Sequence, residues 1–146
     1  MRTFIVRRIA LVLMPLLLIA GRASGQVPAA TPETAAAQKA ATEWLVLIDA
    51  GRYGESWTAA ASAFRQAVTQ DKWQEAAKAA RTLVGPLKSR ALKQATPAKN
   101  PPGAPAGDYI VFQYASSFEN NAAATETVST VLYTDGTWRV VGYVVR

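Results

Sequence analysis

The residue types missing from this chain limit its chemistry as strongly as the types it contains. Its 146 residues include neither histidine nor cysteine. Cysteine nucleophiles, thiolate metal sites, imidazole bases and Ser-His-Asp relays are therefore excluded. Acid–base chemistry would have to use carboxylates, lysine or tyrosine. We predict no metal, no cofactor and no catalytic residue.

Glu126 is the carboxylate in the most unusual setting, because it lies between Thr125 and Thr127 in a segment that predicts a strand. In the mouth of a cone-shaped sheet it could act as a general base or anchor a ligand. The alternative is a cross-strand or inter-subunit salt bridge, with Arg90, Arg139 and Arg146 as candidate partners. We favour the salt bridge, because the predicted register places Glu126 on the sheet face away from the helices.

Two arginines could bind an anion, since the planar guanidinium fork suits carboxylates and phosphates. These are Arg81 and Arg90, although Arg81 lies at the rim of an apolar helical stripe, where arginine stems commonly pack. Asp49 and Arg52 are explained by a local ion pair or by compensation of helix-end charge. The candidate binding residues are Glu126, Arg90, Arg139, Tyr143 and Arg81.

Residues 1–25 have the pattern of a secretory signal peptide. Arginines at positions 2, 7 and 8 precede an apolar run over 9–20, and small residues follow it. The run is shorter than a membrane-spanning helix requires and contains Pro15, so cleavage near Gln26 is favoured over an uncleaved anchor. We expect a periplasmic protein, with full secretion as the second choice.

Removal of this segment changes the charge of the chain. The net charge of +6 includes four arginines within residues 1–25, so twelve basic residues face ten acidic ones afterwards. A net charge of about +2 does not predict nucleic-acid binding. No stable membrane insertion is expected after cleavage. Residues 26–146 are long enough for one domain with its own core.

The first half of this domain predicts three helices. Thr31-Pro32-Glu33 is a typical helix start, and the first stripe is Ala37, Ala41, Trp44, Leu45 and Ile48. A second helix is predicted from about Ser56, with an apolar face reaching Val68. Asp71 is predicted to cap a third helix, which Gly85-Pro86 ends.

The second half predicts an antiparallel meander of about four strands. Leu87 to Gln94 is predicted as a charged edge strand, and 96–107, rich in Pro, Gly and Ala, as a surface loop. Strands follow over 108–119, 124–134 and 137–146, the last two joined at Asp135-Gly136. The predicted class is α+β, with the helices on one face of a curved sheet.

Turn positions predict which side chains share a face. A two-residue turn at Asp135-Gly136 pairs Tyr133 with Trp138, Val131 with Val140 and Ser129 with Gly142. A turn at Asn120-Asn121 adds Ile110, Phe112 and Tyr114 to the same, core-facing side. The opposite face would carry Tyr109, Val111, Gln113, Glu126, Val128, Thr130, Leu132, Arg139, Val141 and Tyr143. That face is too apolar for solvent alone, so a partner, a second copy or a ligand is predicted to cover it.

Several short motifs resemble an exported bacterial family, called domain of unknown function 4019, over essentially the whole mature chain. They include Trp44-Leu45 with Asp49, then Tyr53, Ser56-Trp57, Phe64, Trp73, Arg81, Gly85, Ser89-Arg90, 103–109, Glu126-Thr127-Val128, Asp135-Gly136, Trp138-Arg139-Val140 and Gly142-Tyr143. The resemblance implies an exported single domain and no assigned activity. By fold analogy the element order is also similar to cystatin-like and nuclear-transport-factor-2-like α+β rolls.

Two functions are compatible with these residues. The favoured one is a non-catalytic envelope module that binds a small ligand or a protein partner, including a second copy through the outer sheet face. The alternative is a small periplasmic hydrolase or isomerase that uses a carboxylate such as Glu126 in a roll cavity. An enzyme would need a buried carboxylate of raised pKa beside a pocket, whereas a module needs only an apolar surface with a polar rim.

Overall fold

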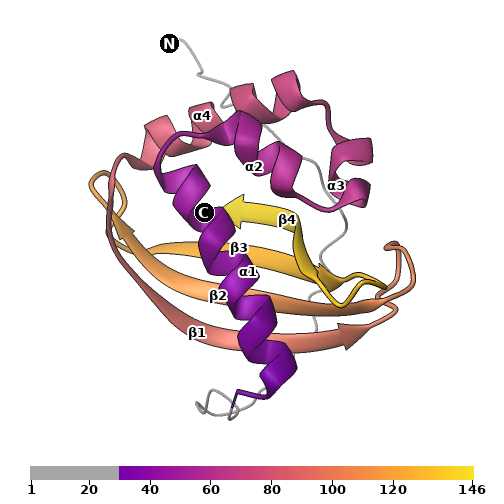
Figure 1. The fold of residues 1–146 in the computed structure, drawn as a ribbon. Coiled ribbons are helices and arrows are strands. Elements are labelled where there is room, and N and C mark those ends of the chain that lie inside the picture. The colour runs from indigo at the N-terminus through magenta and orange to yellow at the C-terminus, as the bar shows by residue number, and fades with distance from the viewer. Residues whose placement is uncertain (1–29) are drawn as a thin grey trace.

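The computed structural model describes residues 30–146, in which helices come first and a four-stranded sheet follows (Figure 1). The helices are α1 (Pro32–Asp49), α2 (Tyr53–Ala59), α3 (Ser62–Ala67) and α4 (Gln70–Val84). The strands are β1 (Leu87–Lys99), β2 (Asp108–Phe118), β3 (Ala124–Leu132) and β4 (Trp138–Val145), in the order β1-β2-β3-β4 with antiparallel neighbours. The α+β class and the meander are confirmed. The predicted signal peptide lies outside the described residues.

Helix α1 starts and packs as predicted. The Thr31 hydroxyl accepts a hydrogen bond from the Thr34 amide at 3.1 Å, and Pro32 occupies the first turn. All five residues of the predicted stripe are buried. Within residues 30–146, no helix combines the length and the apolar character needed to cross a bilayer.

The predicted second helix is two short helices, α2 and α3, so three helices become four. The break falls at Ala60 and Ala61, whose backbones are extended. The Ala61 amide donates a 2.7 Å hydrogen bond to the Val140 carbonyl of β4. This tertiary bond satisfies a backbone group at the edge of the sheet, which outweighs the local helical periodicity.

Helix α4 begins earlier than predicted, because Thr69 and not Asp71 is its N-cap. The Thr69 hydroxyl accepts from the Lys72 amide at 3.4 Å, and Asp71 lies in the first turn, where its charge complements the helix dipole. At the other end Gly85 has a positive φ of 77° and its amide donates to the Arg81 carbonyl. This glycine ends the helix where the sequence predicted.

Strand β1 lies at the edge of the sheet, as predicted, but it is longer than predicted. It continues to Lys99, and Pro97 pairs with Ile110 within it. A proline is compatible with an edge strand, because the missing N–H can face away from the neighbouring strand. The predicted loop over 96–107 is therefore wrong for its first four residues, and the connection spans 100–107.

The predicted sheet register is wrong by one residue between β2 and β3. The tight turn is Glu119-Asn120, flanked by mutual backbone bonds between Phe118 and Asn121, and not Asn120-Asn121. One extra residue also lies on the β3 side, because Phe118 is opposite Asn121 but Ser116 pairs with Ala124. The net shift is one residue, so Phe112 pairs with Val128, and Tyr114 with Glu126. Because side chains alternate, this shift moves Glu126, Val128 and Thr130 from the predicted outer face to the core face.

The β3–β4 hairpin differs from its prediction only near the turn. The Tyr133 amide donates to the Thr137 carbonyl and Gly136 has a φ of 81°, which makes a three-residue loop of 134–136. Leu132, not Tyr133, therefore faces Trp138. A bulge opposite Ser129 and Thr130 restores the predicted pairing of Ser129 with Gly142.

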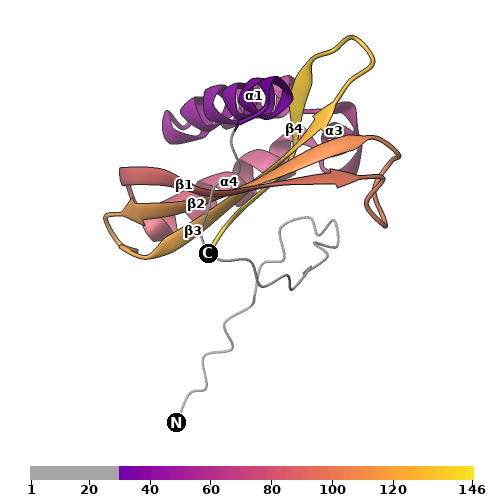
Figure 2. The ribbon, with the colours of Figure 1, turned by 90° about the horizontal axis from the view of Figure 1, so that it is seen from below.

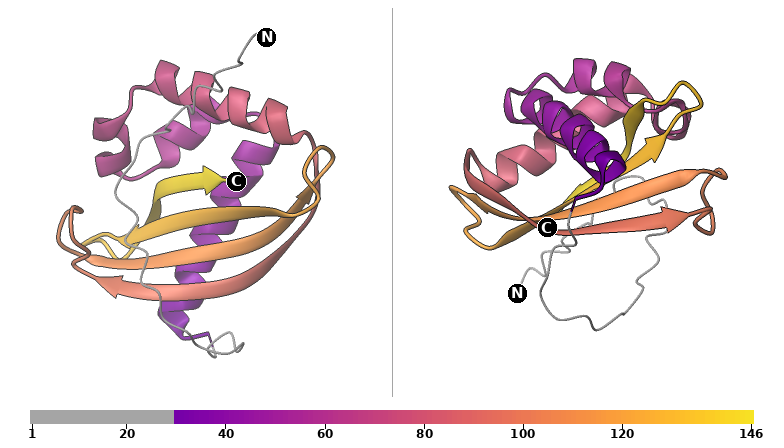
Figure 3. Two further views of the ribbon diagram at one scale, coloured as in Figure 1. Left: turned by 180° about the vertical axis from the view of Figure 1, so that it is seen from behind. Right: turned by 60° about the horizontal axis from the view of Figure 1, so that its bottom comes forward.

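The main core lies between the helices and one face of the curved sheet. Helix α1 crosses this face, while α2, α3 and α4 lie beyond the β4 edge (Figure 1). Seen from below, α1 lies clear of the strands on one side of the sheet (Figure 2). Views from behind and from below show β4 bending away from the other strands toward the helices (Figure 3). Trp44, Trp73 and Tyr143 meet in the centre, with ring centroids 5.4–6.4 Å apart. Tyr143 was predicted on the outer face and is a core residue.

Candidate functional site

Glu126 is fully buried and is surrounded by hydrogen-bond donors from four side chains. Its Oε2 accepts from the Arg90 Nε at 2.6 Å and from the Ser116 hydroxyl at 2.5 Å. Its Oε1 accepts from the Tyr143 hydroxyl at 2.6 Å, the Arg90 Nη2 at 3.0 Å and the Arg81 Nη1 at 3.5 Å. Both oxygens are therefore occupied by protein groups, and none of the carboxylate faces solvent.

Asp49 supplies a second carboxylate to the same two arginines. Its Oδ2 and Oδ1 accept from Arg90 Nη1 and Nη2 at 2.8 and 3.0 Å, a bidentate contact. Its Oδ1 also lies 3.0 Å from Arg81 Nη2. Asp49, Arg81, Glu126 and Arg90 thus form a closed ring in which acidic and basic side chains alternate. We call these four residues the charge ring.

The charge ring joins elements that are distant in sequence. Asp49 ends α1, Arg81 is in the last turn of α4, Arg90 is on β1 and Glu126 is on β3. The two hydroxyl donors, Ser116 and Tyr143, add β2 and β4. The charge ring and these two donors together connect both long helices to every strand of the sheet.

Exposure increases from Glu126 toward Asp49. The side chain of Glu126 is 0% exposed, that of Arg81 8%, that of Arg90 15% and that of Asp49 26%. The Arg81 guanidinium also lies over the Phe118 ring, with its carbon 4.7 Å from the ring centroid. The ring is thus sealed by the core on the Glu126 side and reaches solvent at Asp49.

Burial and charge act in opposite directions on Arg90. Desolvation lowers the pKa of its guanidinium, but its hydrogen bonds to Asp49 and Glu126 outweigh that effect and hold the pKa above the ordinary value. Burial, together with the nearby Glu126 carboxylate, raises the pKa of the Tyr143 hydroxyl. Arg90 therefore stays charged and Tyr143 stays protonated at neutral pH, which keeps both as donors to Glu126.

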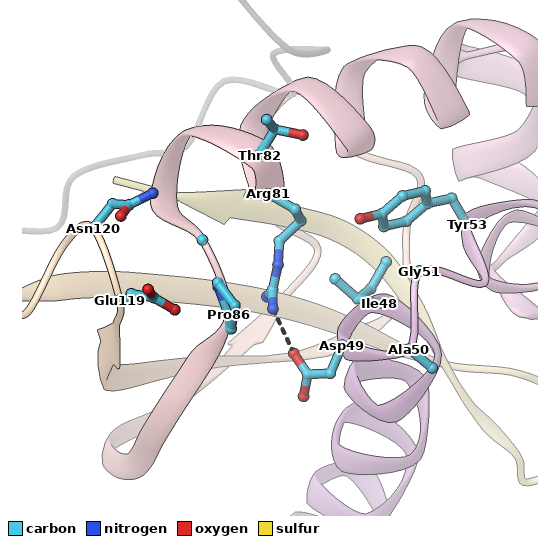
Figure 4. A pocket seen from close by; sticks show the side chains of 11 residues that line it. Ile48, Asp49, Ala50, Gly51, Tyr53, Arg81, Thr82, Pro86, Glu119 and Asn120 are labelled. Atoms are coloured by element: carbon cyan, nitrogen blue, oxygen red, sulfur yellow. Dashed lines mark ion pairs between the residues drawn. The ribbon is translucent and has the colours of Figure 1, made fainter.

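A depression of about 550 Å³ opens beside the charge ring (Figure 4). It lies between the ends of α1 and α4, the start of α2 and the β2–β3 turn. Figure 4 shows the Arg81 guanidinium directed from α4 toward Asp49, with Tyr53 on one side and Glu119 and Asn120 on the other. Its lining residues are Ile48, Asp49, Ala50, Gly51, Tyr53, Arg81, Thr82, Gly85, Pro86, Glu119 and Asn120.

Four of the five candidate residues come together around Glu126, and one lies elsewhere. Arg90, Arg81 and Tyr143 all donate to Glu126, so the predicted salt bridge from Glu126 to Arg90 is confirmed. The guanidinium of Arg139 instead lies 4.4 Å from the Tyr133 ring centroid and 3.4 Å from the Asp135 carboxylate. A smaller depression of about 290 Å³, between α3 and the β3–β4 hairpin, contains none of the candidate residues.

The sequence prediction missed Asp49 and Ser116. The local Asp49–Arg52 ion pair is wrong, because Arg52 pairs with Glu55 instead. Ser56, where the second helix was predicted to start, is buried within α2 and accepts from the Trp73 indole at 2.9 Å. The sequence signal for Asp49 was a carboxylate at the end of a helix, which could also have indicated a partner distant in sequence.

These elements define an α+β domain in which two long helices and a meander sheet are joined by a buried charge ring. Residues 40–143 match the family model described as "Protein of unknown function (DUF4019)", and the chain belongs to that family. No curated protein matches the chain.

Among solved structures, the chain is similar to Aln2 from a Streptomyces species. The two are 12% identical, the match covers 83% of this chain and 93% of that one, and the TM-score is 0.49.

Proposed function

We propose that this protein is an exported, non-catalytic module of the cell envelope that binds a small molecule in the depression beside the charge ring. Export is supported by the signal-peptide pattern of residues 1–25. The binding role is supported by a depression of about 550 Å³, which is lined by both polar and apolar residues. Periplasmic location is favoured over full secretion.

The observation that carries the non-catalytic role is that both carboxylate oxygens of Glu126 already accept hydrogen bonds from the protein. A general base needs a free lone pair within hydrogen-bond reach of a substrate proton. Both oxygens of Glu126 already accept from Arg90, Ser116 and Tyr143, and the side chain has no exposed surface. The alternative of a hydrolase or isomerase using Glu126 would require this ring to open first.

The charge ring has a simpler role in such a module, because it gives the depression a rigid floor. Arg81 and Asp49 line the depression and are fixed by contacts to Arg90 and Glu126 behind them. Side chains held in this way lose little conformational freedom when a ligand binds. Preorganised walls of this kind favour ligand binding.

A homodimer through the outer sheet face stays a prediction, but its apolar basis is smaller than the sequence suggested. Val128, Thr130 and Tyr143 face the core. On β2 and β3, several side chains that alternate with the core residues are small or polar: Val111, Gln113, Ala115, Thr125, Thr127 and Ser129. Tyr109 and Val131 also occupy such positions, but they are already buried in a cluster with Ala61 and Val141. A small ligand is therefore favoured over a second copy.

Native mass spectrometry of the protein purified from its own envelope fraction tests this proposal. We expect a mass that corresponds to a chain starting near Gln26, with a small molecule retained at low collision energy. Recovery of the protein from the cytosol, with residues 1–25 still attached, would contradict export. If a substrate were found and Glu126→Gln abolished its conversion in a folded protein, the non-catalytic role would be wrong.

A further inference from the structure

The charged side chains that line the depression are not balanced in sign. Glu119 is exposed on the rim, and among residues 30–146 it takes part in no ion pair. Arg81 is the only basic residue among the described residues of the lining. Its guanidinium is held by Asp49 and Glu126 and covered by Phe118. This part of the chain therefore gives the lining one unpaired negative charge and no unpaired positive charge.

Two helix ends add to this negative potential. Asp49 at the end of α1 lines the depression, as do Arg81 and Thr82 in the last turn of α4. The C-terminal end of a helix carries partial negative charge. Among residues 30–146, the carbonyl groups of Asp49 and Thr82 are the ones in the last four of each helix that accept no hydrogen bond. Helix α1 has no basic residue in its last turn. In α4 the Thr82 carbonyl would bond the amide four residues later, but that residue is Pro86, which has no N–H.

Backbone contacts hold the acidic side of the depression in place. The Glu119 amide donates to the Pro86 carbonyl and the Asn120 amide to the Val84 carbonyl, both at 2.9 Å. These bonds attach the β2–β3 turn to the junction of α4 and β1. The Glu119 carboxylate is therefore carried by a fixed backbone at the rim, and it is not on a loose loop.

An aromatic side chain completes the opposite wall. Tyr53 lines the depression from the first turn of α2, and Figure 4 shows its ring across from Glu119 and Asn120 with the hydroxyl toward the centre. Aromatic faces attract ammonium groups at distances within about 6 Å. Carboxylate, helix carbonyls and an aromatic ring together are groups that favour a cation.

We propose that the depression binds a small organic cation, with the ligand's ammonium group between Glu119 and the ends of α1 and α4. This inference rests on the proposed binding role and specifies its ligand class. A neutral polyol would gain nothing from the negative potential, and an anion would meet Glu119 and two helix C-termini with no free arginine from residues 30–146 to pair with. The charge of the ligand is therefore the property to test.

Three probes of equal chain length but different charge separate these cases: diaminobutane, butanediol and succinate. The full processed protein is titrated with each at low salt, and binding is read from the backbone amide NMR shifts of Gly51, Gly85 and Asn120, which line the depression. We expect diaminobutane to shift these amides and the other two probes to leave them unchanged. The affinity should fall as salt is added, because the charges on the rim are screened.

Glu119→Gln is the decisive variant, and Glu75→Gln is its matched control. Glu75 is a glutamate on α4 that does not line the depression. One exposed charge pair contributes up to ~1 kcal/mol, which is about a five-fold change in affinity. We expect Glu119→Gln to weaken diaminobutane binding by about three- to five-fold, while Glu75→Gln leaves it unchanged.

The outcomes separate this inference from the proposed function. Equal shifts by butanediol, shifts by succinate, an unchanged affinity in Glu119→Gln, or no shift with diaminobutane would each overturn the cation assignment. If the native protein nevertheless retained a neutral or anionic molecule, the binding role would stand without it. If no molecule were retained and no probe bound, both would fail.

Discussion

Replacing Glu126 by glutamine should destabilise the protein strongly, because it removes one of two negative charges from the buried charge ring. Arg81 and Arg90 are 8% and 15% exposed, so water cannot replace the lost carboxylate. The new amide would also point an N–H group at the Arg90 Nε or at the donors on the other oxygen. Removing one partner of a buried ion pair costs about 3–5 kcal/mol, and we expect a loss in that range.

Urea and thermal unfolding at pH 7 measure this cost. For a domain of this size, ~4 kcal/mol corresponds to a fall in Tm of roughly 10–20 °C. Glu75→Gln is the control, because the same chemical change on α4, away from the ring, should stay within about 0.5 kcal/mol of the parent. A Glu126→Gln protein within about 1 kcal/mol of the parent, with the same m-value, would refute the idea that the ring is a closed, desolvated unit.

Three further changes test other parts of the structure. Arg139→Ala should cost only about 0.5–1 kcal/mol in urea unfolding, because the contact with Tyr133 is partly exposed; a loss as large as that of Glu126→Gln would contradict its place outside the ring. Gly136→Ala should cost roughly 1–2 kcal/mol, since its φ is 81° although the space around it is empty, and an unchanged Tm would argue against the three-residue loop. Tyr143→Phe should weaken the alkaline loss of stability: burial and Glu126 raise the folded pKa above the unfolded value of 10.0, so stability is full below pH 10 and falls above it by up to ~1.4 kcal/mol per pH unit for this residue. Unfolding at pH 8 and pH 11 measures that slope in both proteins, and equal slopes would show that Tyr143 is not the buried hydroxyl responsible.

Local signals in the sequence predicted most elements and their types. The Thr31 cap, the Trp44 stripe, the Gly85 stop and the edge position of β1 all depend on neighbours within a few residues. Patterns of this kind can be read without knowing the fold. The break between α2 and α3 could not be read, because a hydrogen bond from Ala61 to Val140, in the last strand of the sheet, causes it.

The face of the sheet was mispredicted because it depends on the exact turn. The tight turn lies at Glu119-Asn120 instead of Asn120-Asn121, and one extra residue follows it between Asn121 and Ala124. Together these changes shift the register by one residue, which exchanges the two faces of β3 relative to β2. Asparagine is common in turns at either position, so composition did not distinguish them. Arg90 is nevertheless one of the three partners that the sequence indicates for Glu126, and the structure pairs the two.

The wider ring was beyond the sequence because its members are far apart in the chain. Arg90 lies 41 residues from Asp49 and 36 from Glu126. A nearby arginine, Arg52, offered Asp49 a plausible local partner, yet it pairs with Glu55. Long-range ion pairs of this kind follow from strand order and register together, and the turn residues left the β2–β3 register ambiguous.

The weakly specified β2–β3 register suggests a reason for placing a charge ring in the core. A buried ion network often stabilises no more than apolar residues of the same volume, so stability alone does not account for it. A one-residue slip of β3 would turn Glu126 outward and leave Arg81 and Arg90 buried with only Asp49 as partner. We infer that the ring selects the native register, which the β2–β3 turn specifies weakly. Cross-strand NMR contacts between Val128 and Tyr143, paired in the native sheet, report on β3–β4, and those between Phe112 and Val128 report on β2–β3. If a folded Glu126→Gln protein kept the β2–β3 contacts as uniformly as its parent, register selection would not be the role of the ring.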